Sequence, residues 1–171
     1  MPEQYDFIDV REECLEAAHK IMEGVEENIS RNIISTTYIT NLDDHKLPIN
    51  DNQYDLIFTF FSLEHLYPLQ AYLNEYKRIL NPGGRLVGAI PTEGGLAWGL
   101  GRFFTTRRSI MKKYGLDYDK IIALEHCNTA RGVLKALDNT FCPESNNYLW
   151  WPLRLPCIDL NLTISFDCKR Q

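Results

Sequence analysis

The order of apolar and polar positions between residues 54 and 91 predicts a strand, a helix and a second strand. Residues 54–66 and 85–91 carry apolar runs without alternation, which is typical of parallel strands covered on both faces. Residues 69–80 between them have apolar side chains at helical spacing, and the Asn-Pro-Gly-Gly stretch at 81–84 ends that helix. The pattern predicts a right-handed crossover in an open α/β domain, which binds ligands beyond the carboxyl ends of its strands.

The flanking segments predict further elements of the same kinds. Strands are expected at residues 5–10, 32–39, 148–153 and 158–168, and helices at 11–28, 102–113 and 128–139. The alternation over 158–168 is typical of an antiparallel strand that finishes the sheet. We expect one domain over residues 1–171.

Composition and charge narrow the classes of function. With 171 residues and 44% hydrophobic content, the chain is long enough for one domain with a real core. The net charge of -5 argues against a nucleic-acid groove, and no apolar run approaches the length of a membrane span. Five scattered cysteines without a C-x-x-C pair indicate reduced thiols and no metal site. The residues therefore predict a cytoplasmic protein with no nucleic-acid or membrane partner.

Three segments, in their order and spacing, form a recognisable set. They are YDFIDVR at 5–11 followed by a helix, DDHKLP at 43–48, and EHL at 64–66 followed by EYKRILNPGGR at 75–85. Together they resemble the class I S-adenosylmethionine-dependent methyltransferases, in particular the small-molecule group called type 11. The resemblance covers residues 5–91 well and continues more loosely to the end.

The resemblance implies a fold and a cofactor. The fold is α/β and Rossmann-like, a mostly parallel sheet with helices on both faces and an antiparallel C-terminal strand. The cofactor is S-adenosylmethionine. The cofactor-binding residues that it implies are Asp9 and Val10 at the ribose, Asp43 and Asp44 at the adenine, and Phe60 and Ser62 in the pocket wall. Asp9 could instead serve as an acid at the start of a helix, and Asp43 and Asp44 could lie in a solvated turn.

The resemblance also exposes a gap. The family's first strand and glycine-rich turn should precede Tyr5, where only residues 1–4 stand, so we expect a chain truncated at its amino end. Either it is a fragment of a longer methyltransferase, or it binds cofactor poorly, or a partner chain fills the gap.

Catalytic candidates lie at the Glu64-His65 pair. A histidine has a pKa near neutrality and could remove the proton of a methyl acceptor, although His65 could also simply order its loop by hydrogen bonding. Residues 92–127 stand where this family usually places its acceptor-binding cap. Trp98 and Arg102 in that stretch offer stacking surface and charge, and His126 could face the acceptor from the other side.

The sequence thus predicts methyl transfer from S-adenosylmethionine to an O or N atom of a small metabolite, with a saccharide as one candidate. The alternative is a catalytically inactive remnant that acts as a binding or scaffold protein, with a homodimer covering the exposed sheet. A nicotinamide-dependent oxidoreductase is disfavoured because no glycine fingerprint precedes Asp9.

Overall fold

The computed structural model describes residues 4–9, 11–29, 34–39 and 45–171. The chain forms two compact units, Met1–Pro48 and Ile49–Gln171. The first unit contains β1 (Gln4–Asp9), α1 (Glu12–Ile29) and β2 (Ile34–Ile39). The two strands pair in parallel, from Gln4 opposite Ile34 to Asp9 opposite Ile39, and α1 packs on β1 with Leu15 buried. The parallel pairing requires a crossover, which α1 supplies.

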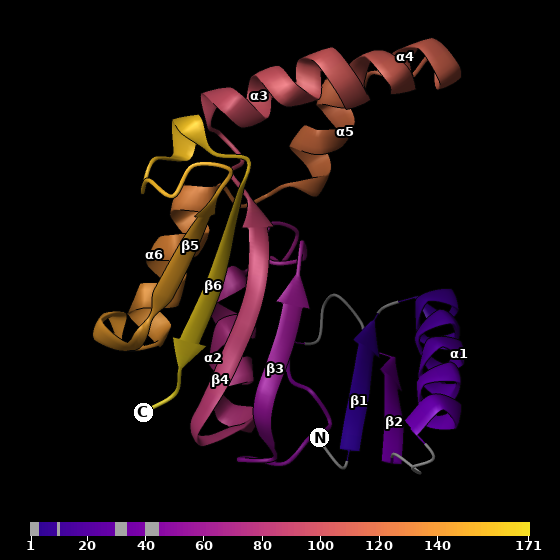
Figure 1. Ribbon diagram of the computed structural model, residues 1–171, viewed down its shortest axis with the longest axis vertical. Coiled ribbons are helices and arrows are strands. Elements are labelled where there is room, and N and C mark those ends of the chain that lie inside the picture. The colour runs from indigo at the N-terminus through magenta and orange to yellow at the C-terminus, as the bar shows by residue number, and fades with distance from the viewer. Residues whose placement is uncertain (1–3, 10, 30–33, 40–44) are drawn as a thin grey trace. The chain divides into compact units, whose positions relative to one another are not determined.

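The second unit begins with the predicted crossover. Its elements are β3 (Tyr54–Phe60), α2 (Leu69–Ile79), β4 (Leu80–Pro91), α3 (Leu96–Arg102), the π-helical turn η1 (Phe103–Arg107), α4 (Arg108–Tyr114), α5 (Tyr118–Glu125), α6 (Ala130–Thr140), η2 (Pro143–Ser145), β5 (Asn147–Trp151), η3 (Ile158–Leu160) and β6 (Thr163–Lys169). The strands form one sheet in the order β3-β4-β6-β5 (Figure 1).

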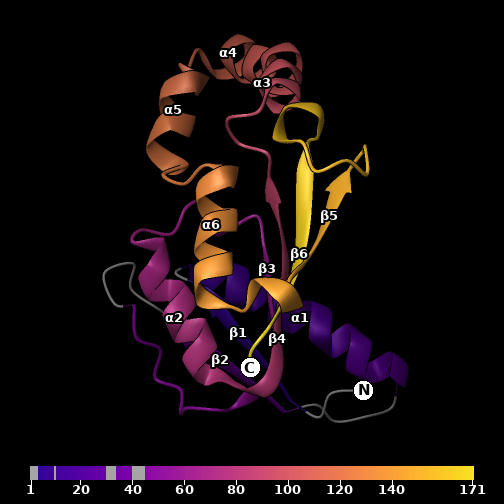
Figure 2. The ribbon, with the colours of Figure 1, turned by 90° about the vertical axis from the view of Figure 1, so that its left-hand side faces the viewer.

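The core of the second unit lies between this sheet and two helices. Helices α2 and α6 pack on each other, and both lie on the same side of the sheet (Figure 2). Their apolar stripes meet the inward side chains of β4 and β6. The buried core comprises Leu63, Leu69, Leu73, Leu80, Leu86, Ile90, Ala130, Val133, Leu137, Phe141, Ile164, Phe166 and Cys168. Full burial of each large apolar side chain stabilises the unit by about 1.5–3 kcal/mol.

Local chemistry fixes the helix ends. The side chain of Thr129 accepts a hydrogen bond from the N–H of Gly132 at 3.2 Å, as expected of an N-cap. Helix α2 ends at Ile79, and Gly83 takes a left-handed conformation with φ of +83°. The Pro-Gly-Gly stretch therefore makes the predicted turn, but strand geometry already begins at Leu80 and the turn lies inside β4.

The α/β fold is confirmed, and the four-stranded sheet is mixed. In the four-stranded sheet β3 and β4 are parallel, whereas β6 is antiparallel to both of its neighbours, β4 and β5. The predicted last strand begins later than expected, because Ile158–Leu160 forms a 3-10 turn that leads into β6. Glu75 does not belong to the apolar positions at helical spacing in α2, yet it is buried and bonded to Arg78.

No helix in the described part of the chain combines the length and apolar character that crossing a bilayer requires.

Gly88 lets β3, β4 and β6 approach closely. A Cβ atom there would lie 1.8 Å from the carbonyl oxygen of Thr59 and 2.6 Å from Cζ of Phe166. We predict that Gly88→Ala lowers the free energy of unfolding by about 3 kcal/mol, because the backbone of β3 must shift. Urea denaturation followed by circular dichroism measures this loss.

Gly99 in α3 supplies the matched control, because a Cβ atom there meets nothing within 4 Å. Gly99→Ala should raise stability by up to about 1 kcal/mol through helix propensity. Equal denaturation midpoints for the two variants would contradict the close packing at Gly88.

Candidate active site

The loop after β3 carries the two residues predicted to be catalytic. Phe61 takes a left-handed conformation, with φ of 51°, and its N–H donates to the carbonyl of Ala89 at 2.8 Å. The hydroxyls of Ser62 and Thr59 are hydrogen-bonded, and the N–H of His65 donates to the carbonyl of Ser62 at 3.0 Å. The chain therefore turns sharply at the carboxyl end of β3.

Asn128 fastens this loop to the segment between α5 and α6. Its side-chain amide donates to the carbonyls of Leu63 at 2.9 Å and Leu66 at 2.7 Å. Its backbone N–H donates to the carbonyl of Glu64 at 3.1 Å. These bonds satisfy backbone carbonyls that the irregular loop would otherwise leave without partners. Asn128 thereby holds residues 63–66 beside the chain segment that carries His126.

The imidazole of His65 is held in one tautomer. Its Nδ1 lies 2.9 Å from the carbonyl oxygen of Glu125, and a carbonyl can only accept, so Nδ1 carries the proton. In the neutral ring Nε2 is then the basic atom. It lies 3.9 Å from Oε1 of Glu64, too far for a hydrogen bond, and the side chain is 40% exposed. His65 therefore presents the unprotonated Nε2 on a side chain that is open to solvent.

His126 lies directly against His65. The ring centroids are 4.6 Å apart and the rings are nearly perpendicular. Nδ1 of His126 lies 3.1 Å from Oε2 of Glu93, so this imidazole is also anchored through Nδ1. The structure thus brings two predicted residues, His65 and His126, into contact although they lie 61 positions apart in the chain.

Glu93 organises the predicted acceptor residues. Its Oε2 accepts from Nε1 of Trp98 at 2.5 Å as well as from His126, and its Oε1 accepts from Arg102 at 3.5 Å. Trp98, Arg102 and His126 therefore converge on one carboxylate. The sequence analysis did not single out Glu93. Its position, two residues past the end of a parallel strand at Pro91, is the signal that could have identified it.

The positive charge of Arg102 is balanced by two carboxylates of the protein. Its guanidinium lies 3.5 Å from Glu93 and 3.6 Å from Asp119, and it stands 6.0 Å from the centre of the Tyr118 ring. These contacts join α3 to α5. The arginine is thereby engaged with the protein's own acids.

Glu64 is buried beneath the histidine pair. It is 3% exposed, and its Oε2 has no hydrogen-bond partner among the described residues. Burial raises the pKa of the Glu64 carboxyl above its ordinary value, and the positive charge that His65 and His126 can carry acts in the opposite direction.

The predicted cofactor residues are described in part. Asp9 is the last residue of β1, and its Oδ1 accepts from the N–H of Arg11 at 2.9 Å and from Nε of Arg11 at 3.4 Å. Phe60 ends β3 with its ring exposed, and Ser62 follows it in the loop. Val10, Asp43 and Asp44 lie outside the described residues.

Comparison with known proteins decides the family. The family model described as a methyltransferase domain matches residues 4–88, about half of the chain. Residues 4–88 belong to this methyltransferase family, and the fold of the chain is that of solved S-adenosylmethionine-dependent methyltransferases. Membership of this family implies S-adenosylmethionine as the cofactor.

The solved relatives share the fold at low sequence identity. An S-adenosylmethionine-dependent methyltransferase from Mesorhizobium loti aligns over 98% of this chain and 81% of its own, with a TM-score of 0.57 and 15% identity. A methyltransferase of the same kind from Methanosarcina mazei aligns over 98% and 82%, with a TM-score of 0.60 and 13% identity.

A curated relative is more similar over a shorter stretch. It is the malonyl-[acyl-carrier protein] O-methyltransferase of Alcanivorax borkumensis, which is 42% identical over 55 residues. That stretch covers 32% of this chain and only 18% of the relative's length.

The residues at the end of β1 fit the cofactor's ribose. The bonds from Arg11 occupy Oδ1 of Asp9, whose side chain is 31% exposed, and Oδ2 has no hydrogen-bond donor among the described residues. A carboxylate at a strand's carboxyl end with one oxygen free can accept from a ribose hydroxyl.

The buried Glu64 carboxyl gives a pH-dependent stability. Burial raises the pKa of the Glu64 carboxyl in the folded protein. Glu64 therefore contributes to the free energy of unfolding below its unfolded pKa of about 4.3. This contribution is lost as the pH rises through the higher pKa of the folded state. We predict that Glu64→Gln gains stability relative to the native chain between pH 4 and pH 8. Urea denaturation at the two pH values measures the change.

Glu125→Gln is the matched control, because Glu125 is the exposed neighbour of the same site. Its stability relative to the native chain should not change between the two pH values. A Glu64→Gln curve parallel to that of the native chain would rule out the effect.

Proposed function

We propose that this chain transfers the methyl group of S-adenosylmethionine to an oxygen or nitrogen atom of a small metabolite. The observation that carries the proposal is the pair of imidazoles at the carboxyl end of β3. His65 exposes a basic Nε2 there, and His126 stands against it. The Alcanivorax relative is named as an O-methyltransferase, which supports oxygen as the acceptor atom.

The residues of the site divide the work of the reaction. S-adenosylmethionine, when bound, supplies a methyl group on a positively charged sulfur, so the protein mainly has to align the acceptor. Nε2 of His65 takes the proton of an acceptor hydroxyl, and the Glu125 carbonyl holds the Nδ1 proton in place. The acidic Glu64 beneath the ring favours the positive charge that the imidazole gains.

The acceptor side of the site consists of Trp98 and His126, both held by Glu93. The indole offers a flat surface on which a saccharide or another polar ring can stack. Arg102 is engaged by Glu93 and Asp119, so it positions Glu93 and leaves little charge for an anionic acceptor. We therefore favour an uncharged acceptor that carries a hydroxyl group.

Cofactor binding tests the first half of the proposal. We predict micromolar binding of S-adenosylhomocysteine in calorimetric titration, weakened at least about tenfold in Asp9→Asn, since one charge-assisted hydrogen bond contributes about 1.5–3 kcal/mol. The asparagine keeps Oδ1 as acceptor for the N–H of Arg11, so the start of α1 is preserved.

Asp6→Asn is the matched control on the same strand, away from its carboxyl end. It should bind the cofactor as the native chain does. Absence of binding by the native chain at millimolar cofactor would contradict the enzyme and favour the alternative, a binding protein without catalysis.

Proton removal tests the second half. With a hydroxyl acceptor found by screening for S-adenosylhomocysteine release, His65→Gln should lower kcat by about 100-fold and leave cofactor affinity unchanged. A kcat of His65→Gln equal to that of the native chain would show that His65 only orders its loop.

A further inference from the structure

The helical arm of α3, η1 and α4 turns a row of apolar side chains to solvent. Six large side chains are between 42% and 69% exposed, namely Leu96, Leu100, Phe103, Phe104, Met111 and Tyr114. Their spacing along residues 96–114 places them on one side of the helix. We call this set the arm surface. Large apolar patches that stay exposed mark interaction sites in soluble proteins.

The opposite side of the arm is fixed to the rest of its unit. Trp98 and Arg102 on that side bond to Glu93. Arg107 lies 5.1 Å from the Phe103 ring of the arm surface, and its Nε lies 2.6 Å from Asp119, which adds a polar contact to α5. The arm therefore cannot roll its apolar side inward without breaking these polar contacts. The exposure of the arm surface is a property of how the arm is attached.

Positive charge accompanies the apolar side chains. Residues 96–116 contain five basic side chains and no Asp or Glu, in a chain whose net charge is -5. Arg108, Lys112 and Lys113 form no ion pair with any residue in the described ranges. The arm surface is therefore locally basic, although the net charge of the protein is negative.

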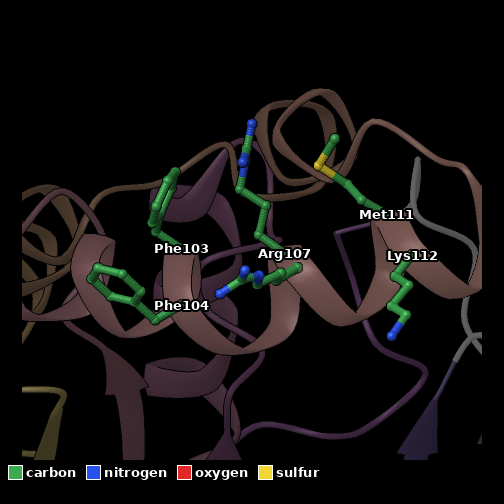
Figure 3. A pocket seen from close by; sticks show the side chains of 6 residues that line it. Phe103, Phe104, Arg107, Met111 and Lys112 are labelled. Atoms are coloured by element: carbon green, nitrogen blue, oxygen red, sulfur yellow. The ribbon is translucent and has the colours of Figure 1, made fainter.

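The shape of the arm surface suits an extended partner. Phe103, Phe104, Met111, Arg107, Arg108 and Lys112 line a hollow of about 640 Å³ (Figure 3). All six come from one stretch of helix, so the hollow is open and has no opposite wall. A small molecule would keep much of its surface in water there, whereas ligand pockets bury most of their ligand.

We propose that the arm surface docks on a lipid bilayer with anionic headgroups, lying in the interface. A helix with Phe and Leu beside Lys and Arg binds such interfaces through apolar burial and charge attraction together. A second copy is a poorer occupant, because a two-fold contact would bring the same basic side chains face to face. The expectation of no membrane partner rested on the absence of an apolar run long enough to span a bilayer, which does not concern interfacial docking. The proposal needs no cofactor and stands apart from the proposed function.

Vesicle flotation of the full chain tests the proposal. The native protein should float with phosphatidylcholine vesicles that contain about 30% phosphatidylglycerol and stay behind with phosphatidylcholine alone. Arg108→Glu/Lys112→Glu should weaken binding about 30-fold or more, because each basic side chain near the surface contributes roughly fivefold. Phe104→Ser should weaken it about tenfold through lost apolar burial.

Matched controls lie elsewhere in the same unit. Arg131→Glu/Lys135→Glu makes the same charge change at the same spacing on exposed positions of α6, and Leu149→Ser removes an exposed apolar side chain from β5. Both should float as the native protein does.

Three outcomes would overturn the proposal. The native chain could fail to float with anionic vesicles, which would leave the arm surface to an acidic protein or to a second copy detectable by sedimentation. The α6 double variant could lose binding as strongly as the arm double variant, which would show attraction without a defined surface. Phe104→Ser could float unchanged, which would show that apolar burial plays no part.

Discussion

The carboxylate of Glu93 is the contact on which the candidate site depends. It stands just past the carboxyl end of β4. It binds the side chains of Trp98 in α3, Arg102 at the end of α3 and His126 after α5. A single carboxylate can do this because it accepts along several lone pairs and each donor is charged or strongly polar. Without it, Trp98 and His126 would have no shared partner, and the arm would lose its polar attachment to the strand end.

The backbone of the sheet fixes where that carboxylate and the histidines can meet. Gly88 allows β3 and β4 to lie so close that Phe61 bonds to Ala89, and the chain turns at once into the loop of Glu64 and His65. Asn128 then ties this loop to the chain after α5, through two backbone carbonyls and its own N–H. The site is therefore built by close backbone approach at one strand end and by polar bonds between loops, and both constraints lie within the second unit.

The sequence predicted the parts of this arrangement that follow from local pattern. Periodicity located α2 and α6. Asp9, Glu64 and His65 were singled out through the resemblance to the methyltransferases, and their roles stay predictions. The sequence also placed Trp98, Arg102 and His126 in one candidate region, but it could not show that they share Glu93. That contact depends on how two segments 33 residues apart fold back on each other, and no local pattern encodes it. The burial of Glu75 was missed for the same reason, because its partner Arg78 also reaches Asp51 and the carbonyl of Ile49.

The orientation of the arm shows why an amphipathic pattern is ambiguous. A stripe with Leu100, Phe103 and Met111 normally predicts a buried face, because apolar burial is the largest favourable contribution to folding. In this chain the other face is held inward instead, by the bonds of Trp98 and Arg102 to Glu93 and the ion pair of Arg102 with Asp119. Exposing six large apolar side chains to water is unfavourable. The free energy of a few charge-assisted bonds exceeds this cost only if the apolar stripe is buried against a partner outside the chain. One orientation of the arm therefore has two consequences. Its polar side bonds to Glu93 and shapes the candidate site, and its apolar side stays exposed.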